Sequence, residues 1–300
     1  VVSNTATSAD DDFSAYKVEH PTSETVVSDG TNHLNILSND KLGDDDSITT
    51  NEVEITQTHT SNPKVKIDTR NGEVNVEGGT PAGVYTLKYK IKEKGQPATA
   101  ASQEKTVTVV VTNKLVSNSG NYGGAPSTTP TPADGGNVLD NVRINDSTSN
   151  PSASEVTITI DNNAGAGTVP YLETSGADKG KIKIPQGTPA GNYTIVYTVC
   201  DNAPAAAQSC QQATATVTVS NNPIIARNDN NNKAVEFSTA VQNVKKADGS
   251  TLNVLGNDTL AGVAATASTV TIETTVPETG ITIKTNGEVE VAANKAAGVY

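Results

Sequence analysis

Few residues of this 300-residue chain have the types and spacing that chemistry requires. Its two cysteines, Cys200 and Cys210, are ten positions apart and have no histidine near them. An isolated close pair of this kind is typical of a disulfide rather than of a metal site. The pair therefore predicts a Cys200–Cys210 disulfide and an oxidising, extracytoplasmic location.

Acidic residues form the second group with possible chemistry. Asp10, Asp11 and Asp12 stand together near the start of the chain, and Asp229 lies in a matching Asn-Asp-Asn run. Oxygen-rich clusters at domain junctions can hold Ca²⁺, although no complete ligand set with a known calcium-loop spacing is present. Two interpretations stay open: a structural Ca²⁺ site at these four residues, or a solvated acidic junction without any cofactor.

Catalytic groups are not apparent in the sequence. His20, His33 and His59 lie in neither a nucleophile turn nor a metal-ligand spacing, and we interpret them as ordinary surface or loop histidines. The net charge of −12 and the pI near 4.7 argue against nucleic acid, which requires a basic partner surface. No run approaches the roughly 20 apolar residues of a membrane span. The sequence predicts a protein that is not an enzyme.

Four lysines alternate along one predicted strand, at positions 88, 90, 92 and 94. They could contact an acidic polysaccharide or another anionic surface. They could equally form a solvent face, or protect an edge strand from pairing with other chains. The second copy of this strand has Thr194, Val196, Thr198 and Cys200 on the corresponding face, which favours the solvent face or the protected edge.

These residues belong to a framework that repeats. The stretch GTPAGVYTLKYKI (79–91) returns as GTPAGNYTIVYTV (187–199), and a third copy begins as KAAGVY at the end of the chain. The copies are 108 (191 − 83) and 107 (298 − 191) residues apart, measured between their glycines. A period of about one domain length predicts three domains, at 9–113, 114–221 and 222–300, with the third incomplete.

Each copy of the stretch predicts a strand whose side chains alternate between two faces. Tyr85, Leu87, Tyr89 and Ile91 fall on one face after a Pro-Ala-Gly turn. Short runs rich in Val, Thr and Ile, separated by Gly, Pro, Asn and Asp, fill the rest of each repeat. The predicted fold class is all-β, with tandem immunoglobulin-like β-sandwich domains in a linear array.

A tyrosine directly after such a turn resembles the tyrosine corner of immunoglobulin-like sandwiches. The predicted corner residues are one Gly and one Tyr in each repeat: Gly83 and Tyr85, Gly191 and Tyr193, and Gly298 and Tyr300. The segment 117–136 is too poor in apolar residues to predict a strand, and we interpret it as a Gly/Pro/Ser/Thr-rich linker. Because the third copy stops at its corner tyrosine, we expect the natural chain to continue into further repeats.

The run NVLGNDTL (253–260) and the pattern GTPAGxYTxxYTVCD resemble the tandem Ig-like repeats of giant bacterial surface adhesins, most nearly the gliding-motility adhesins of the Bacteroidetes. The resemblance implies a stalk or spacer segment of a cell-surface filament, exported by type IX secretion, which contacts an external surface or polysaccharide. The implied partners are further repeats of the same chain and the export and anchoring machinery. The alternative is a carbohydrate-binding or accessory module of a secreted enzyme, which the absence of Trp disfavours.

The same resemblance points to glycosylation. Three Asp-Ser/Thr triplets match the short O-glycosylation signal of the Bacteroidetes, and their acceptors are Ser47, Ser147 and Thr259. Each acceptor falls in the loop that follows the predicted early strand of its repeat. A sugar at such a loop would not disturb a core.

Overall fold

The structure is a computed structural model that describes residues 4–127, 129–162, 169–220, 224–230, 233–260 and 262–300. The described chain divides into two compact units, one of Val1–Asn118, Leu139–Thr159 and Thr198–Ala213, the other of Ser119–Val138, Ile160–Tyr197 and Thr214–Tyr300. This division does not test the three predicted domain ranges, which stay a prediction. The predicted boundary at 221/222 lies outside the described residues.

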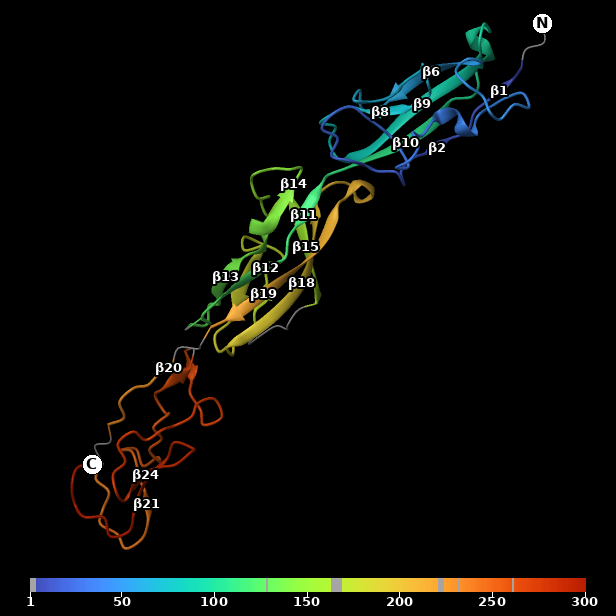
Figure 1. The fold of residues 1–300 in the computed structure, drawn as a ribbon. Helices are drawn as coiled ribbons and strands as arrows, with labels where there is room; N and C mark the ends of the chain where they lie inside the picture. The colour runs from blue at the N-terminus through green and yellow to red at the C-terminus, as the bar shows by residue number, and fades with distance from the viewer. Residues whose placement is uncertain (1–3, 128, 163–168, 221–223, 231–232, 261) are drawn as a thin grey trace. The chain divides into compact units, whose positions relative to one another are not determined.

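The first repeat consists of short strands and one long hairpin (Figure 1). Its elements are β1 (Ala6–Thr7), β2 (Asp11–Asp12), β3 (Val18–Glu19), β4 (Thr25–Val26), η1 (Ile36–Asn39), β5 (Lys41–Leu42), β6 (Val53–Thr60), β7 (Val65–Ile67), β8 (Val74–Val76), β9 (Gly83–Glu93), η2 (Ala98–Ala100) and β10 (Lys105–Thr112). One sheet has the order β2-β10-β9-β6, with β3 also pairing with β10, and a second has the order β4-β8-β7.

The second repeat has the same two sheets. Its elements are β11 (Leu115–Ser117), β12 (Gly120–Gly124), β13 (Ala133–Asn137), η3 (Val138–Asn141), β14 (Val142–Ile144), β15 (Val156–Asn162), β16 (Tyr171–Leu172), β17 (Lys181–Ile184), β18 (Gly191–Asp201), η4 (Ala205–Ala207) and β19 (Cys210–Val219). The sheet orders are β12-β19-β18-β15 and β13-β17-β16, and β11 pairs with β14.

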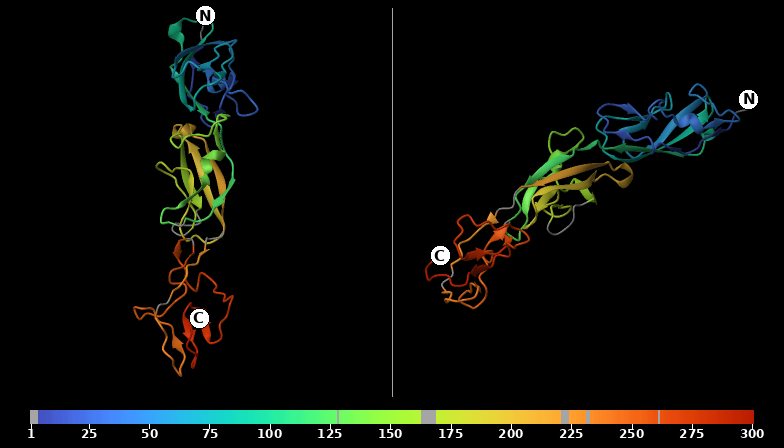
Figure 2. Two further views of the ribbon diagram at one scale, coloured as in Figure 1. Left: turned by 90° about the vertical axis from the view of Figure 1, so that its left-hand side faces the viewer. Right: turned by 60° about the horizontal axis from the view of Figure 1, so that its bottom comes forward.

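The third repeat contains only short strands among its described residues. They are β20 (Ile224–Ile225), β21 (Gln242–Asn243), β22 (Thr259–Leu260), β23 (Val263–Ala264), β24 (Ile281–Ile283) and β25 (Val289–Val291). They form the sheets β20-β22-β23 and β21-β25-β24. Both views of Figure 2 show this orange-to-red part of the chain mainly as loops.

One three-stranded sheet keeps its order and register in all three repeats. Val76 of β8, Ile184 of β17 and Val291 of β25 occupy the same position in the central strand, and each lies opposite the first residue of an outer strand, β4, β13 or β21. In the first two repeats the second sheet completes a sandwich with this one. The all-β, immunoglobulin-like fold class predicted from the sequence is confirmed.

The alternating strand predicted from the repeated stretch is also confirmed. In β9, Leu87, Tyr89 and Ile91 are 0% exposed, and in β18 Tyr197 and Val199 are 0% exposed as well. The side chains between them are partly exposed, as a strand with one buried face requires. These residues anchor the core that the two sheets enclose, since β9 and β18 are central strands of their sheets.

The prediction that 117–136 is a linker without strands is wrong. Gly120–Gly124 forms β12, and β13 begins at Ala133. Strand β12 is paired through its backbone with β19, so it needs no apolar side chains of its own. Glycine even helps here, because a Cβ at Gly123 would lie 2.0 Å from the Thr218 carbonyl oxygen.

The early strands predicted at 34–40 in the first repeat and at 252–258 in the third are tight turns instead, whereas the matching run 142–146 of the second repeat contains β14. Asn35 accepts a hydrogen bond from the Leu37 backbone N–H at 2.9 Å and caps η1. Asn253 does the same for Leu255 in the third repeat, also at 2.9 Å. Asparagine competes with strand pairing through such local hydrogen bonds, which is why an apolar alternation ends in a turn here.

The Asn35 side chain also explains the glycine that recurs before each corner. Gly72 has φ +82°, in the left-handed region, and a Cβ on it would lie 2.4 Å from Asn35 Oδ1. The Asn35 amide cannot retreat freely, because it donates to the Asn71 carbonyl at 2.6 Å while it caps η1. Gly287 and Asn253 repeat this arrangement.

We predict that Gly72→Ala destabilises the first repeat by about 2–3 kcal/mol, because it adds a clash with a fixed side chain to left-handed backbone strain. Gly95→Ala is the matched control. Gly95 has φ +79° with nothing within 4 Å of its Cβ position, so only the strain of about 1 kcal/mol applies. Urea unfolding of both variants measures the difference, and equal losses would contradict the role given to Asn35.

Candidate functional site

The three neighbouring aspartates of the first repeat do not converge on one point. Asp10 accepts a hydrogen bond from the Thr106 backbone N–H at 2.8 Å, and Asp12 accepts one from Ser14 at 3.0 Å. Asp11, by contrast, is only 4% exposed and faces the core. The described residues contain no group of three His, Cys, Asp or Glu side chains that could hold a metal ion.

Asp11 belongs to a buried cluster with Tyr89 and Asp40, which is 0% exposed. The Tyr89 hydroxyl lies 2.9 Å from Asp11 Oδ2 and 3.0 Å from Asp40 Oδ2. One hydroxyl carries one proton, so it cannot satisfy both carboxylates fully at once. Asp40 also accepts a hydrogen bond from the Ala9 backbone N–H, which lies 2.9 Å from Oδ1.

Burial changes the protonation of this cluster. Desolvation raises the pKa of Asp11 to about 7, and the neighbouring Asp40 and Asp10 charges act in the same direction. Desolvation likewise raises the pKa of Asp40 to about 6, against hydrogen bonds from Ala9 and Tyr89 and the charge of Lys105, which lower it. Burial, and after it the charges of the two carboxylates, raise the pKa of the Tyr89 hydroxyl, which stays protonated as their donor.

The third repeat has the same pair of aspartates and the second does not. Asp229 takes the place of Asp11, and Asp258 takes that of Asp40, with Asp258 Oδ1 accepting from the Arg227 backbone N–H at 2.7 Å. Burial raises the pKa of Asp229, and the Asp258 charge adds to the effect. In the second repeat the equivalent residues are Gly120 and Val142, neither of which can ionise. The acid pair is therefore a feature of individual repeats and not of the framework.

We predict that the first repeat becomes less stable as pH rises from about 4 to about 7. A folded-state pKa above the unfolded value of 3.8 means that the folded form holds the proton more tightly, so the stabilisation is complete below about pH 4 and is lost as pH passes through about 6 to 7. Hydrogen exchange of peptides from β9, corrected for intrinsic rates, measures this slope. Asp40→Asn should flatten it, and the exposed-site control Asp46→Asn should not; an unchanged slope in Asp40→Asn would contradict the assignment.

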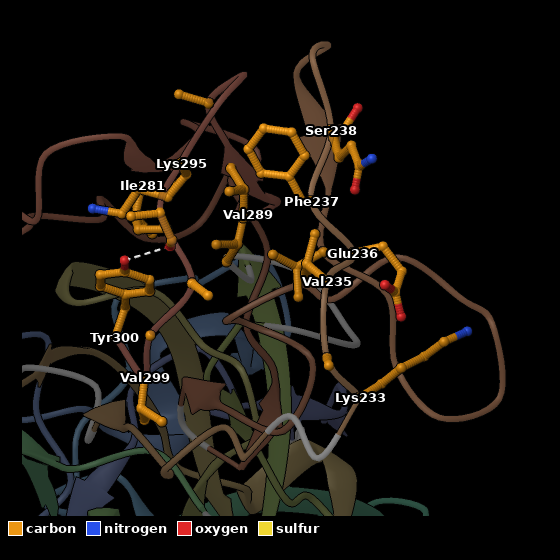
Figure 3. A pocket seen from close by; sticks show the side chains of 18 of the residues that line it. Lys233, Val235, Glu236, Phe237, Ser238, Ile281, Val289, Lys295, Val299 and Tyr300 are labelled. Atoms are coloured by element: carbon orange, nitrogen blue, oxygen red, sulfur yellow. Dashed lines mark hydrogen bonds between the residues drawn. The ribbon is translucent and has the colours of Figure 1, made fainter.

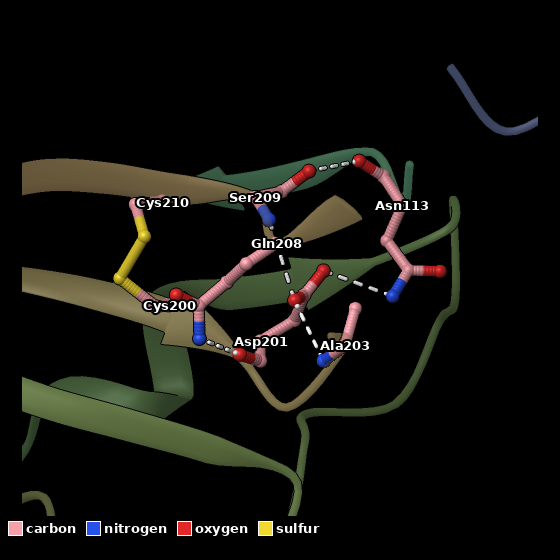
Figure 4. The surroundings of a disulfide bond; sticks show 7 residues. All are labelled: Asn113, Cys200, Asp201, Ala203, Gln208, Ser209 and Cys210. Atoms are coloured by element: carbon pink, nitrogen blue, oxygen red, sulfur yellow. Dashed lines mark hydrogen bonds between the residues drawn. A yellow bond between two sulfur atoms is a disulfide. The ribbon is translucent and has the colours of Figure 1, made fainter. Parts of the chain in front are cut away.

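The predicted disulfide is confirmed. Cys200 is the penultimate residue of β18 and Cys210 is the first of β19, and their sulfurs are bonded across the hairpin (Figure 4). Both cysteines are on the outer face, whereas Val199 is 0% exposed. The bond therefore links two adjacent strands of one sheet and does not cross the core between sheets.

The loop closed by this disulfide holds the start of the second repeat. Asp201 is 1% exposed and accepts hydrogen bonds from the Ala203 N–H at 3.0 Å and from the Asn113 side-chain amide at 2.9 Å. The Asn113 carbonyl in turn accepts from the Ser209 hydroxyl (Figure 4). Asn145 adds a third contact, donating to Asn113 Oδ1 at 2.7 Å. No pattern in the sequence predicts this polar anchor, because Asn113 is distant from its partners along the chain.

We predict that replacing both cysteines by serine lowers the free energy of unfolding of the second repeat by about 2–3 kcal/mol, as expected for a loop of this length. The measurement is urea unfolding of the oxidised chain, the reduced chain and the double variant. The reduced chain should match the variant. A loss below about 1 kcal/mol would mean that the hairpin is already fixed without the bond.

The three predicted corner tyrosines make the same hydrogen bond. Each hydroxyl donates to the backbone carbonyl four residues earlier: Tyr85 to Pro81 at 2.7 Å, Tyr193 to Pro189 at 2.8 Å and Tyr300 to Ala296 at 2.6 Å. The corner glycines Gly83 and Gly298 leave room for the ring two residues later, since a Cβ would lie 3.4 Å and 3.0 Å from it. This bond defines the tyrosine corner.

A hollow of about 610 Å³ opens over the three-stranded sheet of the third repeat. Val235, Phe237, Ile281 and Val289 line it together with Tyr300 (Figure 3). Phe237 is 71% exposed. In the first repeat the matching sheet residues pack against Leu87, Tyr89 and Val107 of β9 and β10. The hollow is thus the sheet face that the long hairpin covers in a complete sandwich.

The lysines of β9 lie on an interior strand, so the protected-edge interpretation is wrong. Strand β9 pairs with β6 on one side and β10 on the other. Lys88 contacts Glu104 at 3.0 Å and Lys92 contacts Glu54 at 2.6 Å, on the solvent side of the sheet. Exposed ion pairs of this kind contribute little to stability.

The remaining predicted residues lie on the surface. His33 Nδ1 is 2.8 Å from Glu73 Oε1, and this pair is exposed. Ser47 and Ser147 are exposed, and Thr259 lies half-buried at the start of β22. Glycosylation of these three acceptors stays a prediction. Among the described residues, no helix has the length and apolar character that a membrane crossing would need.

Comparison with known proteins finds a likeness of structure only. No protein-family model and no curated protein sequence matches this chain. The human desmocollin-1 ectodomain is similar at 11% identity and a TM-score of 0.30, over 97% of this chain and 55% of that one. Mouse cadherin-23 EC22-24 is similar at 12% identity and a TM-score of 0.29, over 97% and 89% of the two chains. Protocadherin gamma B2 domains 3-6 give 8% identity and a TM-score of 0.30, over 73% and 51%. Values this low carry no information on function.

Proposed function

We propose that this chain is a non-enzymatic repeat segment of a filamentous bacterial cell-surface adhesin. It acts as a stalk or spacer and as a surface-contact element in gliding motility or attachment. Its partners are further repeats of the same chain, the type IX export and anchoring machinery, and an external surface or polysaccharide.

This proposal rests on the contrast between the structural features that recur among the repeats and the polar side chains that do not. The three-stranded sheet and the corner tyrosine hydrogen bond recur in all three repeats, and the capping asparagine with its glycine recurs in the first and third. The side chains capable of chemistry, such as Asp11 and Asp40, do not recur in the second repeat. Repetition of a framework without repetition of a polar site suits a protein whose work is reach and spacing.

An extracellular location is supported by the disulfide. Cys200 and Cys210 are both cross-linked, and the described chain has no free cysteine. Structural disulfides persist in oxidising compartments and are rare in the cytosol. The acidic net charge of −12 suits a surface that stays soluble and separate from its neighbours.

We predict that antibodies against this chain label intact cells of the source organism, and that brief protease treatment of those cells removes the label. A spacer displayed outside the envelope is accessible to both reagents. Labelling that requires permeabilised cells would contradict the proposal. A glycan array separates the alternative: saccharide-specific binding by the chain would favour a carbohydrate-binding module, whose sugar-stacking aromatics would then be sought first at Tyr16 and Phe237.

A further inference from the structure

Two strands near the ends of the second repeat, β12 and β19, run parallel and adjacent. Strand β12 pairs with β19 from Gly120 opposite Ala215 to Gly124 opposite Val219. The contacts begin earlier in the chain, where the Ser117 N–H donates to Gln211 Oε1 at 2.8 Å and Ser119 Oγ accepts from the Thr214 N–H at 3.0 Å. We call residues 117–124 with residues 211–219 the parallel track.

The two backbones of the parallel track approach unusually closely at Gly123. Its φ is +148°, and a Cβ there would lie 2.0 Å from the Thr218 carbonyl oxygen and 2.8 Å from its carbon. Both obstructing atoms are backbone, so no side-chain rotation could relieve the contact. A residue other than glycine at this position would have to push β12 away from β19.

The first repeat contains the same arrangement with different side chains. Strand β2 pairs in parallel with β10, Asp11 opposite Val107, and β3 continues the pairing with Val18 opposite Val111. Asp10 accepts from the Thr106 N–H as Ser119 accepts from Thr214. Two repeats thus keep the parallel pairing although one segment is Asp-rich and the other Gly-rich.

The direction of these strands matters when the chain is under tension. The chain enters the second repeat through β11, which pairs with β14, continues into β12 and leaves the repeat after β19. Tension that passes β11 therefore pulls β12 toward its N-terminal end and β19 toward its C-terminal end. In a parallel pair these pulls are opposite along one axis. The hydrogen bonds between the strands are then sheared together and cannot open one after another. Each of these hydrogen bonds contributes about 1 kcal/mol to stability.

We propose that the parallel track is the element through which the second repeat resists tension along the chain, which makes the repeat a force-bearing unit. This function deepens the spacer role and rests on it. A filament that transmits pulling from a surface to a cell must hold its folded length, and the strands that join the two ends of each repeat determine the force at which that length is lost.

The disulfide supplies a marker for the unfolding of the second repeat. While Cys200 and Cys210 are bonded, the ten-residue separation between them cannot extend when the repeat unfolds. At about 3.5 Å per residue, less the 4.0 Å that already separates the two Cα atoms, reduction releases roughly 30 Å of additional chain. In a single-molecule pulling record, each unfolding event adds a measurable length of chain. The event whose added length grows by this amount in reductant is the unfolding of the second repeat.

The test is to pull the whole chain by its ends and compare the unfolding force of the marked event between variants. Gly123→Val should lower this force through the backbone clash, and Ser119→Ala should lower it less by removing one contact of the track. Gly176→Ala is the control, because Gly176 is a left-handed glycine of the same repeat (φ +69°) with nothing within 4 Å of its Cβ position. Its force should equal that of the unmodified chain.

Two results would overturn the proposal: a marked event at unchanged force in both track variants, or an equal drop in Gly176→Ala. Should Gly123→Val lose the marked event altogether, the repeat has not folded and Ser119→Ala decides alone. Urea unfolding of the same variants separates mechanical from equilibrium effects, since the track variants must lose more force than Gly176→Ala at comparable stability. The spacer function is tested independently by the cell-labelling experiment, and its outcome does not depend on the pulling records.

Discussion

The core of a complete repeat depends on one long hairpin. In the first repeat, β9 and β10 place Leu87, Tyr89 and Val107 against the three-stranded sheet, and all three are 0% exposed. The third repeat has the three-stranded sheet in the same register but no strand of this type among its described residues, and its Phe237 stays 71% exposed. A three-stranded sheet presents one apolar face, and only a second sheet removes that face from water.

The same dependence explains which strand-like runs of the sequence form strands in the structure. Val53–Thr60 and Val156–Asn162 form strands because β9 and β18 pair with them, as the alternation of their residues indicates. The similar run at 269–273 is not a strand. A run with high β propensity thus forms a strand only where a partner strand is present. Whether a partner is present depends on tertiary structure and not on the five residues themselves.

Side-chain pattern was sufficient for the disulfide and the corner tyrosines, because both depend on short separations along the chain. It failed for β12, whose Gly-Asn-Tyr-Gly-Gly sequence has the composition of a loop. The strand exists because the β19 backbone offers it hydrogen bonds, and composition does not record a partner that lies 95 (215 − 120) residues away. The buried pair of Asp11 and Asp40 was missed for the same reason: the sequence shows an acidic run, but only the fold turns one of its three carboxylates inward to Tyr89.

The pairing of β12 with β19 has a consequence for synthesis. When Gly120 of β12 is added to the chain, Ala215 of its partner β19 is still 95 (215 − 120) residues from being made, a delay of roughly 5–20 s at ordinary rates of elongation. Throughout that time the strand has open edges that could pair with any neighbouring chain. A segment of Gly-Asn-Tyr-Gly-Gly, like one containing Asp10-Asp11-Asp12, has too few apolar side chains or too much charge to associate with its own kind. The composition that makes these strands difficult to predict from the sequence also protects them from pairing with other chains until their partner strands are synthesised.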